Sequence, residues 1–289
     1  MEHEVTHPIL AENFQAHRRS YAEHITALAG LAQNSSMGRE IATALASIPR
    51  EKFVMPPPWT IISPMGHTQS ISDDPAVLYQ DVLVPLSAGL GINNGQPSLH
   101  AKCLNALTPR KGESAVHVGA DTGYFTAVLA MLVGETGRVD AYEIVPELAR
   151  QTAANLASFL QVAVHCRSGA EGPLPDCDVI YVNAAAAEPL AAWLDALRPE
   201  GRLLFPLEPQ GASGQMLLVT RKPDGSYPAQ FLWGVQFVAC VGAQNAGAAR
   251  ALDAAFRKGC LNQVRHLFRD NQPDSSCWCA GEGWWLSTG

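Results

Sequence analysis

The sequence is poor in charge, in aromatic residues and in long apolar runs. Of its 289 residues, 16% are charged and 7% are aromatic, and 20 Lys and Arg stand against 27 Asp and Glu, for a net charge of -7. An acidic chain lacks the basic surface that neutralises phosphates, so we expect no nucleic-acid partner. No apolar run reaches the roughly 18 residues of a membrane span, and the start Met1-Glu2-His3-Glu4 lacks the features of a signal peptide. We therefore expect no membrane association and a cytoplasmic protein.

The cysteines do not form a recognisable framework. There are seven of them, an odd number, without a repeated spacing, which favours reduced thiols over disulfides. Cys277 and Cys279 form a C-x-C pair, which has too few ligands for a closed zinc site unless Cys260 or His266 joins it. We expect two packed thiols there and no metal.

What the chain has is apolar content, 47% of its residues, enough for a sizeable core. Its length corresponds to one large domain, or to one medium domain with an appendage. We divide it into a helical and loop-rich N-terminal region over 1–95, a central domain over 96–242 and a C-terminal extension over 243–289.

The N-terminal region begins with helical patterns. Ser35 and Ser36 are suitable helix caps, and Ile41, Leu45 and Ile48 then share one helix face until Pro49 ends the pattern. Prolines and glycines break up the sequence from there to Gly95, with a short strand expected over 82–86. Pro97 precedes a second predicted helix over 98–107.

Strand-like and helix-like segments alternate through the middle of the chain. This alternation predicts crossover units and a mostly parallel sheet that is covered on both faces. Such a sheet binds its ligand at the carboxyl ends of its strands. The expected strands are 114–118, 137–142, 162–165, 177–182 and 201–205, and the expected helices are 122–133, 146–160 and 189–197.

After Pro206 the pattern changes to a hairpin with strands over 216–220 and 235–239, which suits an antiparallel edge. In the extension we expect a helix over 248–258, with a continuation through 262–268 as an option, and an aromatic strand over 278–285. The tryptophans of the extension could cover a site or recognise a partner. We favour packing against the sheet, because large aromatic side chains bury much area.

A glycine-rich turn carries the first functional signal. Gly119-Ala120-Asp121-Thr122-Gly123 lies where a strand passes into a helix, and glycines there allow a tight turn and a close approach of the backbone to a ligand. Glu143 ends the next strand, where an acid can accept hydrogen bonds from both ribose hydroxyls. Together they indicate an adenosine-containing cofactor; the alternative is a plain helix start and a surface acid.

Several motifs occur in the order and spacing of one enzyme family. From about residue 15 to residue 242, the chain resembles the protein-L-isoaspartate O-methyltransferases. The resemblance implies an α/β class I methyltransferase fold, Rossmann-like, with S-adenosyl-L-methionine as cofactor and a protein or peptide carboxylate as acceptor. The motifs that carry it are Ile48-Pro49-Arg50-Glu51-Lys52-Phe53-Val54, 119–129, 142–148, 182–186 and 197–203.

The resemblance also implies which residues bind the cofactor, with three departures, of which one is Ser168 in place of an acidic residue. His117 stands where the family has an acidic residue, and Asp121 replaces the middle glycine of the turn. We expect Asp121 to take over the charge that balances the cofactor ammonium, although it could simply cap the next helix. Ser168 retains a hydroxyl that can accept a hydrogen bond from the adenine. The expected cofactor residues are His117, Gly119, Ala120, Asp121, Thr122, Gly123, Glu143, Ile144, Ser168, Gly169 and Gln215.

The segment 93–101 aligns with the family's substrate loop. Gly95 occupies the position of the active-site serine, Asn93 replaces a threonine, and His100 matches a histidine of some members. We expect Asn93, Asn94, Gly95 and His100 to form the acceptor site, with the asparagines holding a carboxylate and Gly95 widening the pocket. His100 could equally be a packed helix residue.

These inferences predict a carboxyl O-methyltransferase that acts on an isoaspartyl or aspartyl carboxylate, in repair or in peptide tailoring. Two alternatives stay open. The chain could be a catalytically silent relative that serves as an interaction module, because its departures surround one pocket. It could also methylate a small molecule, and a hydroxyl acceptor would then need a base such as His100 or His67.

Overall fold

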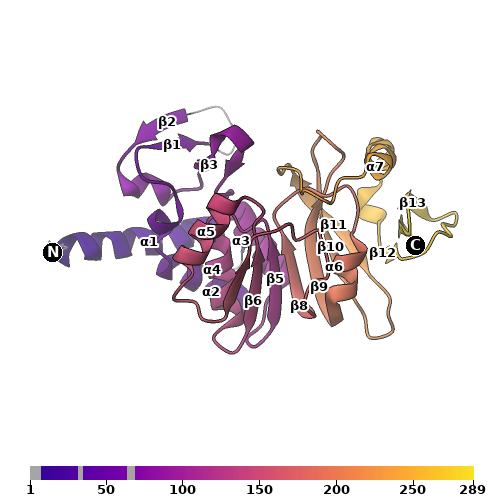
Figure 1. Ribbon diagram of the computed structural model, residues 1–289, viewed down its shortest axis with the longest axis horizontal. Helices are drawn as coiled ribbons and strands as arrows, with labels where there is room; N and C mark the ends of the chain where they lie inside the picture. The colour runs from indigo at the N-terminus through magenta and orange to yellow at the C-terminus, as the bar shows by residue number, and fades with distance from the viewer. Residues whose placement is uncertain (1–7, 32–34, 64–68) are drawn as a thin grey trace.

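The computed structural model describes residues 8–31, 35–63 and 69–289 (Figure 1). Within these ranges, no helix combines the length and the apolar character needed to cross a bilayer. The elements are α1 (Pro8–Leu28), α2 (Ser36–Ser47), η1 (Arg50–Phe53), β1 (Trp59–Ile62), β2 (Gln69–Ser72), η2 (Pro75–Leu78), β3 (Pro85–Ser87), η3 (Ala88–Leu90), β4 (Ile92–Asn93), α3 (Pro97–Leu107), β5 (Ser114–Val118), α4 (Tyr124–Val133), β6 (Arg138–Tyr142), α5 (Pro146–Asn155), β7 (Val162–His165), β8 (Cys177–Val182), α6 (Ala191–Ala196), β9 (Leu197–Leu207), β10 (Gly214–Thr220), β11 (Ala229–Val235), α7 (Ala246–Lys258), η4 (Leu261–Gln263), β12 (His266–Phe268), β13 (Cys277–Gly281) and β14 (Trp284–Ser287).

A seven-stranded sheet organises the molecule, in the order β11-β10-β9-β8-β5-β6-β7. Strands β5 to β9 run parallel, and β10 pairs antiparallel with both β9 and β11. The predicted parallel sheet with an antiparallel edge is confirmed. The chain leaves β5 toward β6 on one side and enters β8 on the other, so the carboxyl ends of these strands form a switch point where a ligand can bind.

Helices cover both faces of this sheet, and side-chain alternation decides which face each residue meets. Ala115 and Tyr181 face one side, where α2, α3 and α4 pack against them. Val116 and Ile180 face the other side, toward α6 and α7. The α2 start agrees with the sequence, because the Ser35 hydroxyl accepts a hydrogen bond from the Gly38 N–H at 2.9 Å.

Three expected elements are misplaced, and a fourth, the single strand expected over 278–285, is instead the antiparallel pair β13 and β14. The second hairpin strand is Ala229–Val235, and the expected stretch 235–239 leaves the sheet instead. The predicted helix does not continue through 262–268: α7 ends at Lys258 and is capped by Gly259, Cys260 adopts φ +62°, and β12 then pairs with β14. The strand expected over 82–86 begins only at Pro85.

The extension packs against the antiparallel side of the sheet. Trp278 contacts Phe231 of β11 and Phe256 of α7 edge-on, with ring centroids 5.1 and 5.4 Å apart. Trp284 and Leu286 are buried in the same core as the strands. Figure 1 shows this part beyond β11, at the opposite end of the molecule from α1. All seven cysteines are free, and residues 8–31, 35–63 and 69–289 contain no cluster of His, Cys, Asp or Glu that could hold a metal.

A buried arginine joins separate segments of the N-terminal region. Arg50 is 1% exposed, and its guanidinium donates hydrogen bonds to the carbonyls of Leu78, Gln80 and Val82 at 2.6 to 2.9 Å. Its charge also lies over the ring of Tyr21, 5.6 Å from the centroid. A charged donor that serves three carbonyls is costly to remove, because buried acceptors then lose their partners.

Replacing Arg50 with Met should therefore destabilise the fold. We expect Arg50→Met to lower the free energy of unfolding by about 3–5 kcal/mol, the range for breaking a buried charged network. Exposed Arg150, 3.7 Å from Glu147, is a matched control, and Arg150→Met should change stability by less than about 0.5 kcal/mol. Urea denaturation measures both; equal effects would contradict the role given to Arg50.

A buried carboxyl group lies just after β9. Glu208 is 3% exposed and accepts a hydrogen bond from the Phe237 N–H at 3.0 Å. Burial raises its pKa to about 7, so the folded state holds this proton more tightly than the unfolded chain does. The contribution to stability is present at low pH and is lost as pH rises from about 4.5 to about 7.

Glu208→Gln removes this pH dependence while it keeps an oxygen for Phe237. Relative to the natural chain, the variant should be more stable at about pH 8 than at about pH 5. The difference between the two free energies of unfolding should change by about 2–3 kcal/mol in favour of the variant. Urea denaturation at the two pH values measures the difference. Glu135→Gln, at an exposed position, is the control; a pH-independent difference for Glu208→Gln would refute the assignment.

Candidate functional site

Two adjoining cavities lie at the carboxyl ends of β5, β6 and β8. The smaller one has a volume of about 280 Å³ and the larger one about 560 Å³. Ile92, Asp121, Asn183 and Val238 line both of them, so these residues mark the junction. The position at the switch point is the one that the parallel sheet predicts.

The turn after β5 forms one wall of the smaller cavity. Gly119 has φ +78°, and a Cβ there would lie 3.3 Å from the Asn183 carbonyl oxygen. The amides of this turn are already used: those of Gly119 and Ala120 donate to the Tyr142 carbonyl, and that of Asp121 donates to Glu143. The chain itself therefore satisfies the N–H groups of Gly119, Ala120 and Asp121.

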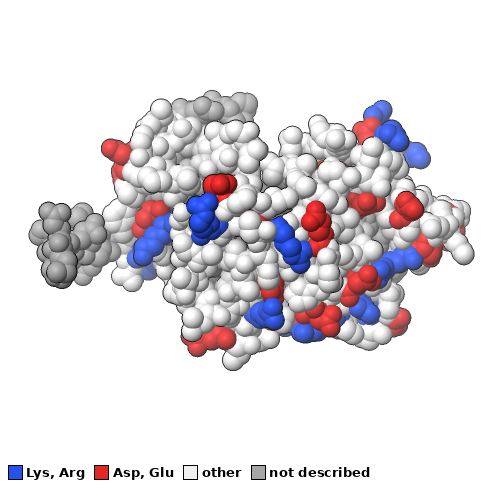
Figure 2. Space-filling model, in the orientation of Figure 1, with Lys and Arg blue, Asp and Glu red and all other residues white. Residues whose placement is uncertain are grey.

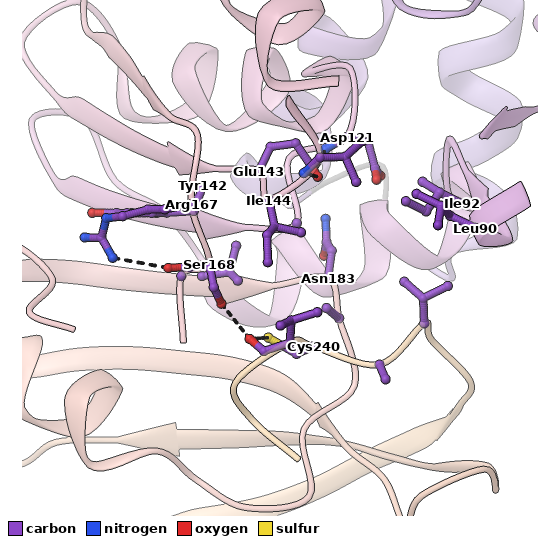
Figure 3. A pocket seen from close by; sticks show the side chains of 18 residues that line it. Leu90, Ile92, Asp121, Tyr142, Glu143, Ile144, Arg167, Ser168, Asn183 and Cys240 are labelled. Atoms are coloured by element: carbon purple, nitrogen blue, oxygen red, sulfur yellow. Dashed lines mark hydrogen bonds between the residues drawn. The ribbon is translucent and has the colours of Figure 1, made fainter. Parts of the chain in front are cut away.

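Glu143 is the central acid of the smaller cavity (Figure 3). It is 4% exposed, and its two oxygens accept hydrogen bonds from the N–H groups of Asp121 and Val145, each at 2.9 Å. Burial raises its pKa, and these backbone donors oppose the shift. A carboxylate oxygen accepts more than one hydrogen bond, so both oxygens can still receive a ligand hydroxyl.

Ser168 and Gly169 line another part of the smaller cavity. The Ser168 hydroxyl donates to the Val241 carbonyl at 2.6 Å (Figure 3) and accepts from the Ala170 N–H at 3.1 Å. A Cβ on Gly169 would lie 2.5 Å from Val118, so a side chain is excluded there. Ile144 supplies an apolar surface at the cavity mouth, with 42% of its area exposed.

Asp121 lies at the junction and contacts both cavities. Its φ of +53° is in the left-handed region, which Asp tolerates better than most residues. Its side chain is half-buried; burial, and then the neighbouring Glu143, raise its pKa well above the usual value. A cation bound beside this pair would favour its ionised form.

His117 lies behind the cavity wall. Its Nδ1 is 2.8 Å from the Thr126 hydroxyl, its Nε2 is 2.6 Å from Asn183 Nδ2, and its ring stacks on Tyr181. Burial lowers the pKa of His117 to about 3, so the ring is neutral. Ala120, Thr122, Gly123 and Gln215 likewise do not line either cavity.

Asn183 is a polar group of the site that the sequence analysis did not single out. It is 8% exposed, and its Oδ1 has no hydrogen-bond partner among the residues that the structure describes. The signal was its place directly after β8, since a polar residue at a strand's carboxyl end reaches the ligand edge of a parallel sheet.

The larger cavity is bounded by the loop before α3. Asn93 and Gly95 line it, and Asn93 Oδ1 accepts from the Gly95 N–H at 2.9 Å. Asn94 turns inward instead: it is 5% exposed, and its Oδ1 accepts from the Val84 N–H. Of the two asparagines, only Asn93 therefore faces this cavity.

Asp81 holds this loop in place. Its carboxylate accepts hydrogen bonds from the Gln96 amide and from both the N–H and the hydroxyl of Ser98, at 2.7 to 2.9 Å. These contacts join the loop to the segment that Arg50 binds. The loop before α3 is thus positioned by polar contacts with Asp81.

His100 occupies the room left by the missing side chain at Gly95. A Cβ built on Gly95 would lie 2.0 Å from His100 Nε2. The expected widening of the pocket at Gly95 is therefore wrong, because the imidazole fills that space. His67, the other candidate base, lies outside the described residues.

Charges are scattered over the surface of the molecule. On the face shown in Figure 2, Lys and Arg are interspersed with Asp and Glu. Several basic residues of the extension have acidic partners: Arg257 pairs with Asp253, and Arg269 is 2.7 Å from Asp195.

The chain matches one family of known proteins. The family model of protein-L-isoaspartate(D-aspartate) O-methyltransferase matches residues 26–245. Protein-L-isoaspartate O-methyltransferase 2 of Archaeoglobus fulgidus is 30% identical over 213 residues, which are 72% of this chain and 88% of that protein. Protein-L-isoaspartate O-methyltransferase 1 of Arabidopsis thaliana is 33% identical over 166 residues, 53% of this chain and 71% of that protein.

Solved structures show the same fold. A protein-L-isoaspartate O-methyltransferase superimposes with a TM-score of 0.64 at 22% identity, over 88% of this chain and 72% of that one. A protein from Plasmodium falciparum described under the same activity, in complex with S-adenosyl-L-homocysteine, gives 0.61 at 19% identity, over 78% of this chain and 98% of that one. The class I methyltransferase fold is confirmed, and the chain belongs to the protein-L-isoaspartate(D-aspartate) O-methyltransferase family.

Proposed function

We propose that this protein transfers a methyl group from S-adenosyl-L-methionine to the carboxylate of an isoaspartyl residue in a protein or peptide. The observation that carries the proposal is the pair of cavities that meet at Asp121 and Asn183. A donor bound beside Glu143 and an acceptor bound beside Asn93 would contact each other at that junction. Membership of the family supports the reaction and the methyl donor.

The residues of the smaller cavity fit the donor. Glu143 would accept hydrogen bonds from the ribose hydroxyls, and Ile144 and Ser168 would frame the adenine. The ammonium group of the donor would lie near Asp121 and the unpartnered Oδ1 of Asn183. When bound, S-adenosyl-L-methionine supplies an electrophilic methyl group.

The acceptor needs no general base, because a carboxylate is already ionised at neutral pH. The protein contributes position and the exclusion of water, which can lower a barrier by several kcal/mol. The product is a methyl ester. Attack by the next backbone nitrogen on this ester releases methanol and forms a succinimide, and water opens the ring partly to normal aspartate, which is a repair of the chain.

The three regions would divide this work. Residues 1–95 would supply Asp81, which holds the loop before α3, and Ile92, which lines both cavities, and residues 96–242 would supply most of the donor cavity, with Glu143. Residues 243–289 would stabilise the fold, since Trp278 and Trp284 are buried in the core that contains the strands of the sheet.

Calorimetry and methyl transfer test the function directly. We expect S-adenosyl-L-methionine and S-adenosyl-L-homocysteine to bind, and labelled methyl groups to appear on a synthetic peptide with one L-isoaspartyl residue. The matching aspartyl peptide is the control acceptor. Binding without transfer to either peptide would reject the proposed acceptor, and no binding of either nucleoside would reject the enzyme.

Glu143→Ala should remove the principal polar contact of the donor. Two lost hydrogen bonds to a charged group correspond to a rise in the dissociation constant of S-adenosyl-L-homocysteine of about 100-fold or more. Glu147→Ala, an exposed acid on α5, is the control and should bind normally. Calorimetry of both variants decides, and unchanged affinity for Glu143→Ala would contradict the assignment.

Asp121→Asn should weaken only ligands that carry the ammonium group. We expect about a 10-fold loss of affinity for S-adenosyl-L-homocysteine, as for one charge-assisted contact, and no loss for 5′-methylthioadenosine, which lacks the amino-acid part. His117→Ala should keep most of the affinity for both, because His117 lies behind the wall. Equal losses for both ligands in Asp121→Asn would instead indicate that Asp121 only shapes the turn.

A further inference from the structure

In the loop before α3, one residue lacks a side chain and the side chain of another fills its place. Gly95 has no side chain, its φ is +70°, and the place where its Cβ would point is occupied by the imidazole of His100, with Nε2 at 2.0 Å and Cδ2 at 2.7 Å. A residue five positions along the chain thus fills the space of a missing one. Both residues line the larger cavity.

The imidazole is held rigidly on its other sides. It stacks on Phe125 of α4 with 3.7 Å between ring centroids and an interplanar angle of 7°. Its Nδ1 is 2.6 Å from the Tyr181 hydroxyl. His100 is 2% exposed, and no residue in the described part of the chain gives its Nε2 a hydrogen bond. One polar atom of a fixed ring therefore remains for whatever enters the cavity.

This ring is neutral. Burial lowers the pKa of His100 well below its usual value, and the facing groups His117 and Arg50 lower it further. A neutral imidazole has one donor and one acceptor nitrogen. The Tyr181 hydroxyl faces Nδ1 and can donate its proton there, to the tautomer whose own N–H is on the other nitrogen. In that arrangement Nε2 carries the N–H.

We propose that His100 Nε2–H replaces the hydroxyl that is missing at Gly95 and donates a hydrogen bond to the acceptor carboxylate in the larger cavity. This inference rests on the proposed function, because it takes the acceptor to be a carboxylate. A hydroxyl acceptor would instead require the tautomer with a bare Nε2. His100 is thus the residue through which this chain selects and orients its acceptor.

The test compares two substitutions of His100 that differ in one donor. His100→Leu keeps an apolar side chain against Phe125 and removes Nε2, whereas His100→Gln places an amide N–H in a similar position. With the isoaspartyl peptide, we expect KM for His100→Leu to rise about 10- to 100-fold, as for a lost hydrogen bond to a charged group, and His100→Gln to recover most of it. Affinity for S-adenosyl-L-homocysteine should not change in either variant.

Gly95→Ala provides an independent probe, because its methyl group would displace Nε2. It should raise KM for the peptide as His100→Leu does. Gly211→Ala is the matched control, since Gly211 also has a positive φ, +76°, but its Cβ would meet nothing within 4 Å. The control separates backbone strain from displacement of the ring.

Each result has a definite meaning. Unchanged KM in His100→Leu overturns the inference, and so does an equal loss of peptide KM and donor affinity, which would mark His100 as a packing residue only. If the natural chain binds S-adenosyl-L-homocysteine but does not methylate the isoaspartyl peptide, the proposed function fails and the inference fails with it. A KM rise that His100→Gln reverses supports the inference.

Discussion

The architecture of the site depends on the buried guanidinium of Arg50. Its three carbonyl contacts fix the segment 78–82, and this segment carries Asp81, whose carboxylate holds the loop before α3. A single cation in the N-terminal region is therefore linked, through backbone carbonyls and one acid, to the wall of the larger cavity. Burial of that charge is tolerable because the guanidinium satisfies several acceptors at once.

Much of the fold could be predicted because it depends on local patterns. The apolar strands around Val116 and Ile180 and the helices between them specify a parallel sheet, and Glu143 was found because the end of β6 is fixed by that sheet. The hairpin strand was misplaced since both 229–235 and 235–239 have strand-like composition, and only pairing with β10 distinguishes them. Helix propensity after α7 was overridden by Gly259 and by pairing with β14.

The details of the site were less predictable, because they depend on contacts between distant residues. His117 was expected beside the cofactor, but Thr126 and Asn183 bind its two nitrogens behind the wall. Gly95 was expected to add room, but the orientation of His100 depends on Phe125 and Tyr181, which lie far along the chain. No linear motif carries that information.

The stretch that follows β11 forms a wall that the two cavities share. Val238 lines both of them, Val241 receives the Ser168 hydroxyl, and the Cys240 N–H is bound to the Ala185 carbonyl. A displacement of this stretch changes both compartments at once. Because both compartments are built on this one short piece of backbone, a substitution there would alter the shapes of the two cavities together.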